Sequence, residues 1–285
     1  MTINLLMQGR LGNNLFQLAY LQKLKSHLQK NRCINIYITK NQLQSLNSIL
    51  NNNSCLFDLI KSNNLKICKE YKPNVKMRIE RKIAKISNLD FPFLSKFIND
   101  KNYLNIFKNL NHKKRLLIDG YFQFGASIDG IPWEEQFKFD LKSKNERLCL
   151  HIRRSDTFTN SKLLEFHKTP SYSFYNNALS IFSRRFNIEQ ELIPIDIYTD
   201  NKEWCKKVFQ GMGDIKFCST ESPTKDFISM MNYKNYIISN STFAFFPALV
   251  SNIIYKNNFT IHPTIWSNGK TYKELLLSQN NWIDI

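Results

Sequence analysis

The chain has 285 residues, of which 42% are hydrophobic and 13% aromatic. This composition excludes an intrinsically disordered protein and leaves enough chain for one large or two medium domains. Lys and Arg outnumber Asp and Glu by 40 to 23, a formal net charge of +17, which favours polyanionic or phosphorylated partners: nucleic acid, an anionic membrane face or nucleotide substrates. A solvated basic surface without a partner is the alternative.

The six cysteines are widely spaced, and no two of them lie within three residues of each other. That spacing excludes zinc-ribbon and thioredoxin-like pairs. The apolar run at residues 3–7 is too short for a signal peptide, and the most apolar window, residues 236–255, is interrupted by polar residues and a proline. We therefore expect a cytoplasmic protein, with peripheral contact at the inner membrane face as an open alternative.

The first part of the chain predicts a strand, a loop, a helix and a second strand. Residues 3–7 form a short apolar run, and residues 9–14 contain two glycines and two asparagines, which is typical of a tight loop. Apolar residues from Leu15 to Leu28 keep helical spacing, and residues 34–38 predict the second strand. In parallel α/β folds such a unit places a ligand at the strand ends, although a plain turn is the alternative because neither a dinucleotide nor a P-loop fingerprint is complete.

Residues 41–115 are rich in Asn, Lys and Leu and carry few strand signals. Residues 76–86 predict a basic helix, whose plainest interpretation is a solvated face. A strand is predicted over residues 116–124, and the charged stretch that follows Trp133 predicts a domain boundary. We expect an N-terminal, acceptor-side domain over residues 1–140 and a C-terminal, sugar-nucleotide-binding domain over residues 141–285.

From Leu148 onward, strands and helices alternate regularly. Such a series predicts a parallel sheet whose ligand-facing loops follow the carboxyl ends of the strands. Pro247 falls where the last helix would need a backbone donor, which predicts a kink or a later helix start. The predicted strands are 148–151, 193–198, 215–217 and 236–239, and the predicted helices are 173–186, 202–209, 225–231 and 243–252.

Three of these strands end in polar residues: 151–156, 200–201 and 240–242. In a parallel sheet they would share one edge. The adjacent Arg153 and Arg154 offer flat forks of donors that suit a diphosphate, whereas a surface ion pair is the alternative. The hydroxyl residues 241–242 and the acidic residue at 200 are either helix caps or ligand contacts.

The sequence contains no Asp-Xaa-Asp motif and no His/Cys cluster with metal-ligand spacing. If a diphosphate leaves during the reaction, its charge would therefore be neutralised by arginines and backbone amides. We expect no metal and no cofactor.

Several motifs resemble the α-1,2-fucosyltransferases of glycosyltransferase family 11. Residues 9–17 (Gly-Arg-Leu-Gly-Asn-Asn-Leu-Phe-Gln) resemble the opening motif of that family. Residues 151–156 (His-Ile-Arg-Arg-Ser-Asp) resemble its GDP-fucose motif, a form of which α-1,6- and protein O-fucosyltransferases share. The supporting motifs, in family order, are residues 120–123, 198–201 with Trp204, 238–243 and 262–266; residues 40–115 match poorly.

The resemblance implies an α/β fold of GT-B type, with two Rossmann-like domains facing a central cleft. It also implies inverting, metal-independent transfer of L-fucose from GDP-β-L-fucose, a co-substrate, to the 2-hydroxyl of a galactoside. The acceptor would be a galactose-containing glycan or lipid-linked oligosaccharide, in the synthesis of O-antigen, lipopolysaccharide or another surface polysaccharide. Another nucleotide-sugar donor is an alternative. A second alternative, from another class, is a basic protein that binds nucleic acid through residues 61–115. We nevertheless expect no nucleic-acid partner.

The resemblance also assigns roles to residues. Arg153 would stabilise the leaving phosphate, with His151 and Asp156 orienting it. Asp156 is the candidate general base, and Asp119 is an alternative. The implied donor-binding residues are Arg10, Gly12, Asn13, Arg154, Asp200, Asn201, Asn240, Ser241 and Thr242, and no residue is expected to bind a metal.

The chain departs from the family pattern at three places. Residues 155–157 are Ser-Asp-Thr where the family usually has Gly-Asp-Tyr, and residues 244–246 are Ala-Phe-Phe where Ser-Trp-Trp is typical. We expect these two changes to alter acceptor or packing details. Asn201 stands where a second aspartate is commoner, and an amide is a weaker acceptor than a carboxylate for the N–H groups of guanine.

Overall fold

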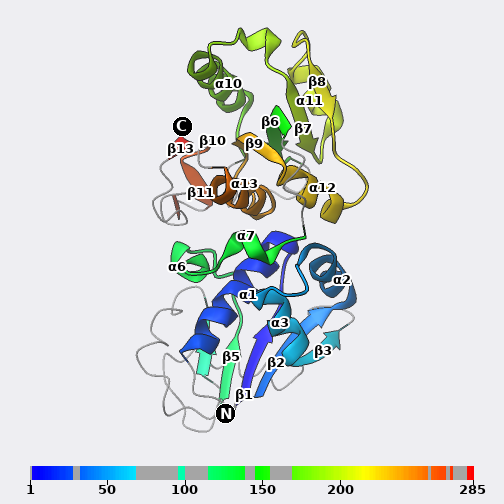
Figure 1. Ribbon diagram of the computed structural model, residues 1–285, viewed down its shortest axis with the longest axis vertical. Coiled ribbons are helices and arrows are strands. Elements are labelled where there is room, and N and C mark those ends of the chain that lie inside the picture. Colours follow the sequence, from blue (N-terminus) through cyan, green and yellow to red (C-terminus); the bar gives the residue numbers. More distant parts are fainter. Residues whose placement is uncertain are drawn as a thin grey trace. The chain divides into compact units, whose positions relative to one another are not determined.

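The computed structural model describes residues 2–27, 33–68, 96–99, 115–138, 145–154, 169–255, 258–267, 270–271 and 281–285. The contacts divide the chain into two units, residues 1–136 and 137–285, whereas the sequence placed the boundary after residue 140. Each unit is an α/β structure with its own parallel sheet (Figure 1). The predicted α/β class is therefore confirmed, and the two units are described in turn.

The first unit is built on a five-stranded sheet in which every pairing is parallel, in the order β3-β2-β1-β5-β4. Strand β2 alternates buried isoleucines with more exposed residues, the period expected of a half-buried strand. Its strands are β1 (Thr2–Leu6), β2 (Cys33–Thr39), β3 (Asn64–Cys68), β4 (Lys96–Ile98) and β5 (Arg115–Ile118). Its helices are α1 (Leu11–Ser26), α2 (Lys40–Ile49), α3 (Cys55–Ser62), α6 (Gly125–Ile128) and α7 (Trp133–Gln136).

Helix α1 begins earlier than predicted, at Leu11, so residues 11–14 form its first turn and are not part of a loop. Glycine and asparagine are poor helix formers, and their presence at residues 12–14 led to the prediction of a loop there. Tertiary hydrogen bonds override the propensity, because the buried Asn14 donates through Nδ2 to the Gln8 carbonyl at 3.0 Å and to Gln17 Oε1 at 3.2 Å.

The second unit is built on a six-stranded sheet with all pairings parallel, in the order β13-β10-β9-β6-β7-β8. The predicted parallel βαβα series is confirmed. The strands are β6 (Asn145–Ile152), β7 (Ile195–Thr199), β8 (Ile215–Phe217), β9 (Tyr233–Ile238), β10 (Phe259–His262) and β13 (Trp282–Asp284), with a separate antiparallel pair, β11 (Ile265–Ser267) and β12 (Lys270–Thr271). The helices are α10 (Tyr172–Phe186), the 3-10 turn η2 (Gln190–Leu192), α11 (Lys202–Val208), α12 (Pro223–Met230) and α13 (Thr242–Ile254).

The core of the second unit surrounds β6. Residues 148–152 of this strand are all buried, as expected for a central parallel strand covered on both faces. Helix α10 contributes a buried stripe at helical spacing, Tyr175, Ala178, Leu179 and Phe182. Burial of each large apolar side chain contributes about 1.5–3 kcal/mol. The packing therefore holds the carboxyl end of β6 in a fixed position.

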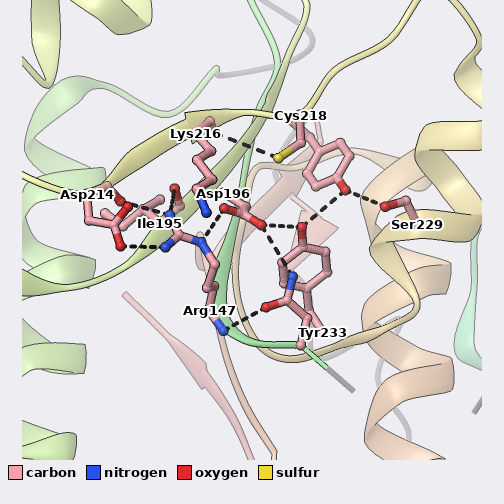
Figure 2. A network of polar contacts seen from close by, with 10 residues as sticks. Arg147, Ile195, Asp196, Asp214, Lys216, Cys218, Ser229 and Tyr233 are labelled. Atoms are coloured by element: carbon pink, nitrogen blue, oxygen red, sulfur yellow. Dashed lines mark hydrogen bonds and ion pairs between the residues drawn. The ribbon is translucent and has the colours of Figure 1, made fainter. Parts of the chain in front are cut away.

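A polar network joins four strands of this sheet near their amino ends (Figure 2). Arg147 on β6 forms ion pairs with Asp196 on β7 and with Asp214, which directly precedes β8, both at 2.5 Å. Tyr233 on β9 donates to Asp196 Oδ2 at 2.6 Å. The Asp196 carboxylate is only 4% exposed, and its charge is matched by these donors, as a buried carboxylate requires.

Two other expectations can be compared with the described residues. Pro247 lies inside α13 and is buried, so the helix does not start after it; the ring removes the hydrogen bond to the Phe243 carbonyl. The predicted basic helix at residues 76–86 lies outside the described residues. Within the described part of the chain, no helix is long and apolar enough to cross a membrane.

Candidate active site

The three polar strand ends of the second unit lie next to one another. Strands β9, β6 and β7 are neighbours, with His151 paired to Ile238 and Ile152 paired to Thr199. Because all three strands run in parallel, their carboxyl ends lie at the same edge of the sheet (Figure 1). The prediction that these residues share one edge is confirmed.

His151 is a buried, neutral histidine at the end of β6. Its side chain is 6% exposed, and its Nδ1 lies 2.9 Å from Ser239 Oγ at the end of β9. Burial, reinforced by the charge of Arg153, lowers its pKa from 6.5 to about 3. The imidazole therefore carries no charge near neutral pH. It links two strand ends but does not add a cation to the site.

Arg153 directly follows β6 and is half-buried. After burial, the charge of Arg153 is the second cause that lowers the pKa of His151. Asp156, the predicted orienting carboxylate and candidate base, lies outside the described residues. Arg153 thus places a cation directly after β6, the middle one of the three strands.

Arg154 lies against the neighbouring loop and helix. Its guanidinium carbon is 3.9 Å from the centre of the Trp204 ring, a cation–π contact. Its Nη1 donates to the Pro170 carbonyl at 3.4 Å, and its backbone N–H donates to Asp200 Oδ1 at 2.7 Å. Burial lowers the pKa of Arg154, but an arginine stays cationic. In this geometry Arg154 fixes the end of β6 beside α11.

Asp200 and Asn201, at the end of β7, have different local roles. Asn201 is the N-cap of α11, and its side chain accepts from the Trp204 backbone N–H at 3.0 Å. The interpretation of Asp200 as a helix cap is therefore wrong, because its carboxylate accepts instead from the Arg154 backbone. Aspartate and asparagine are equally good N-caps, so the asparagine at 201 keeps the cap that the commoner aspartate would provide.

The third strand end leads into α13. Ser241 is the N-cap and accepts from the Phe243 N–H at 3.3 Å, while Thr242 is the first helical residue. Asn240 donates through Nδ2 to the Trp266 carbonyl on β11 at 3.1 Å. The cap interpretation of Ser241 is confirmed. The start of the helix also brings the positive end of its dipole to this edge of the sheet.

The predicted residues of the first unit gather where β1 meets α1. Gly9 has φ +75°, and a Cβ there would lie 2.2 Å from Asn13 Nδ2, so only glycine fits. Arg10 is exposed and is the N-cap position of α1, without a side-chain cap bond, whereas Gly12 is buried in the first turn. Asn13 accepts through Oδ1 from Gln123 Nε2 at 2.8 Å.

A buried polar network beneath this turn was largely missed by sequence reasoning. Gln8 donates to Asp119 Oδ1 at 2.7 Å, and Gln17 donates to the Gly120 carbonyl at 2.7 Å. Asp119 is 4% exposed, which suits a structural carboxylate better than a general base that must reach a substrate. The available signal was Gln17 itself, a polar residue at a helix position surrounded by apolar ones.

The described ranges contain no group of three or more His, Cys, Asp and Glu side chains that could hold a metal ion. The polar groups described at the strand ends of the second unit are two arginines, a neutral histidine, hydroxyls, amides and one exposed carboxylate. Such a set can bind phosphate oxygens through a guanidinium and the start of a helix.

Two α/β units with parallel sheets and polar loops at the carboxyl ends of their strands are the architecture of the GT-B class of glycosyltransferases. The chain belongs to glycosyl transferase family 11, because the sequence model of that family matches residues 2–285. This membership agrees with the motif resemblance and covers nearly the whole chain.

The chain is also similar to individual proteins. The chain is 29% identical over 142 residues to an alpha-1,2-colitosyltransferase of Escherichia coli, an alignment that covers 48% of this chain and 47% of that protein. The match thus spans about half the length of the curated relative. A family 9 glycosyl transferase from Veillonella parvula has a similar fold, with a TM-score of 0.50 and 9% identity over 100% of this chain and 86% of that one. The E. coli heptosyltransferase WaaC has a TM-score of 0.49 and 8% identity over 100% and 92%.

Proposed function

We propose that the protein transfers L-fucose from GDP-β-L-fucose to the 2-hydroxyl of a galactoside, with inversion at the anomeric carbon, in the synthesis of a surface polysaccharide. The observation that carries this proposal is the meeting of three polar strand ends on one edge of a parallel sheet. Membership of glycosyl transferase family 11 over residues 2–285 supports the reaction class.

Arg153 is proposed to act on the leaving group. In an inverting transfer the acceptor hydroxyl attacks in line while GDP departs, so negative charge accumulates on the β-phosphate oxygens in the transition state. The half-buried Arg153 would interact more strongly with that developing charge than with the ground state, and such an interaction lowers the barrier. The neutral state of His151 supports this role, because a second cation would raise the cost of placing Arg153 there.

The neighbouring residues would position and complete the donor site. Arg154 and Asp200 hold the ends of β6 and β7 together. The exposed Asp200 carboxylate is a better acceptor for the N–H groups of guanine than the Asn201 amide is. The backbone amides at the start of α13, after Ser241, are suited to a phosphate. No metal is required in this scheme.

A second donor is favoured by a specific observation, the printed activity of the E. coli relative as an alpha-1,2-colitosyltransferase. Colitose is fucose without its 3-hydroxyl, so a site for one sugar needs little change to bind the other. A site that hydrogen-bonds a hydroxyl rejects the analogue that lacks it strongly, whereas an apolar pocket discriminates weakly. The ratio of kcat/KM for the two GDP sugars would therefore show which kind of pocket is present.

The test is a donor and acceptor screen with GDP-fucose, GDP-colitose and UDP-galactose, with and without EDTA. We expect turnover with a GDP 6-deoxy sugar that EDTA does not abolish, and none with the UDP sugar. Arg153→Lys keeps the charge but loses the fork, and it should reduce turnover at least 100-fold while leaving the Tm unchanged, on the order of what a lost transition-state donor costs. Strict metal dependence, or full turnover by Arg153→Lys, would contradict the mechanism.

Calorimetric titration separates the proposal from the nucleic-acid alternative. The excess of basic residues would suit either a nucleotide or a polynucleotide. We expect heat from GDP binding and only weak, salt-sensitive binding of a short oligonucleotide. Tight oligonucleotide binding without a GDP signal would overturn the proposed function.

A further inference from the structure

The loop that follows β5 contains a bulky residue in a conformation that L side chains seldom adopt. Phe122 has φ +53°, in the left-handed region. Its ring is completely buried and lies parallel to the Tyr20 ring of α1, with centroids 4.2 Å apart and planes 2° apart. Such backbone strain persists only where the surroundings enforce it, and it is concentrated at functional sites.

The residue after this turn makes a specific polar contact. Gln123 donates through Nε2 to Asn13 Oδ1 at 2.8 Å, which joins the β5–α6 loop to the first turn of α1. A left-handed residue changes the direction of the chain sharply, so the conformation of Phe122 decides where Gln123 lies. The buried ring stack thus fixes the Gln123 amide relative to α1.

This contact also determines the orientation of the Asn13 amide. A carboxamide has one acceptor oxygen and one donor nitrogen, and a donor at Gln123 selects the orientation that turns Oδ1 toward it. The nitrogen then lies over Gly9, where a Cβ would be only 2.2 Å from it. Gly9 and Arg10 are both exposed, so the backbone beside this nitrogen faces solvent.

We propose that Gln123 is a positioning residue of the transfer site. It does not contact the substrate itself, but it holds the Asn13 amide so that Nδ2 donates to an oxygen of a bound substrate. That oxygen belongs to a sugar hydroxyl or to a phosphate, and both are acceptors of the same kind. The inference rests on the proposed function and on the family resemblance, which implies that Asn13 binds the donor. The Phe122 turn is the device that sets Gln123 in place.

The sharpest test is Gln123→Glu, which keeps the shape but removes the donor at neutral pH. Two acceptor oxygens would then face each other, and the Asn13 amide would rotate to turn its nitrogen toward residue 123. We expect kcat/KM at pH 7.5 to fall about 10- to 100-fold, the loss that follows from one misdirected, partly buried hydrogen bond. A rise in KM for the nucleotide sugar places the accepting oxygen on the donor substrate, whereas a rise for the galactoside places it on the acceptor sugar.

Acid pH supplies an internal rescue. When the glutamic acid at 123 is protonated, its O–H donates to Asn13 Oδ1 and restores the native orientation. The ratio of variant to wild-type kcat/KM should therefore rise several-fold between pH 7.5 and pH 5. Gln44→Glu makes the same chemical change at an exposed position of α2, and its ratio should stay near 1 at every pH. Tm values measured at the same pH separate restored orientation from restored folding.

Several outcomes would overturn the inference. If Gln123→Glu keeps wild-type kcat/KM at pH 7.5, the two amides are paired the other way round and Gln123 does not aim the Asn13 nitrogen. A reduced ratio that does not change with pH would show a merely structural role. If Gln123→Glu fails to fold, Asn13→Asp tests the same point, because it keeps the acceptor for Gln123 and replaces only the donor; retained turnover would refute the proposal.

A substrate-free measurement keeps this inference separate from the proposed function. If the wild-type protein transfers no sugar, the proposed function fails, but the geometry is still testable by NMR of side-chain amides. The Asn13 amide signal is the one lost in Asn13→Asp, and in Gln123→Glu it should shift as the carboxyl titrates. An Asn13 signal that is unaffected by that titration would refute the positioning contact itself.

Discussion

At the scale of single residues, Phe122 offers a direct measure of backbone strain. Phe122→Ala and Phe122→Gly both delete the same completely buried ring, so each should destabilise the protein by about 3–5 kcal/mol. Glycine alone tolerates φ +53° without a steric penalty. We therefore expect the glycine variant to be about 1 kcal/mol more stable than the alanine variant, the reverse of the usual order. Urea unfolding measures both, and the usual order would contradict the left-handed backbone.

Two buried histidines should make folding stability depend on pH. His151 has its pKa lowered to about 3, and His262 has its pKa lowered to about 4, in both cases chiefly by burial. Below about pH 6.5 the unfolded chain binds protons that the folded state cannot, so stability falls as the pH is lowered from 6.5 toward 4. Each histidine adds a slope of up to about 1.4 kcal/mol per pH unit.

The contribution of one histidine can be removed separately. His262→Gln should flatten the dependence of unfolding free energy on pH between 6.5 and 4 relative to wild type. Urea titrations at a series of pH values provide the measurement. An identical slope in wild type and His262→Gln would show that this side chain is not buried in its neutral form.

The role of Arg154 illustrates what residue patterns cannot predict. The adjacent arginines suggested two forks for phosphate, because a sequence shows charge and spacing but not direction. In the structure Arg154 lies over Trp204, fifty residues further along the chain. The same limit applied to Gln8 and Gln17, whose partners come from the loop after β5.

At the scale of elements, the start of α11 allows a prediction about both stability and donor binding. Asn201→Ala removes the N-cap contact to Trp204 and should cost about 1 kcal/mol. Asn201→Asp should preserve stability within a few tenths of a kcal/mol and increase affinity for GDP, because a carboxylate is the stronger acceptor for guanine. Urea unfolding and calorimetry test the two parts independently. Weaker GDP binding by the aspartate variant would argue against guanine contact at this loop.

Elements were predictable where the apolar pattern was strong. Strands β6 to β9 and helices α10 to α13 were predicted with small shifts in their ends, because buried strands and one-sided helices leave clear periods in the sequence. Strand β3 was missed because it is largely exposed and gives no such period. The start of α1 was misplaced because its stability comes from buried side-chain bonds and not from helix propensity.

At the scale of the whole molecule, the net charge of +17 predicts attraction to anionic lipid surfaces. Basic side chains near such a surface contribute about 1 kcal/mol each, and salt screens the attraction within about 10 Å at 0.1 M. We expect the protein to sediment with vesicles that contain phosphatidylglycerol at low salt and to be released at about 0.5 M NaCl, where screening is stronger. Vesicles of phosphatidylcholine alone are the control. Equal binding to both lipids, or binding that salt does not reduce, would refute electrostatic attachment.

The α/β class and the glycosyltransferase family were accessible from sequence because the motifs occur in order along the whole chain. Their relation to the sheet needed the structure, since only the strand order makes β9, β6 and β7 neighbours. Much of the basic region between residues 61 and 115 lies outside the described residues, and its role stays a prediction.

The polar network around Arg147 has a consequence for how the sequence of this protein can evolve. It joins β6, β7, β8 and β9 near the ends opposite to those where His151, Asp200 and Ser241 lie. The anchoring network and the proposed recognition residues therefore occupy opposite ends of the same strands. Substitutions in the recognition loops leave the anchorage intact, so new sugar specificities can arise on this scaffold with little loss of stability.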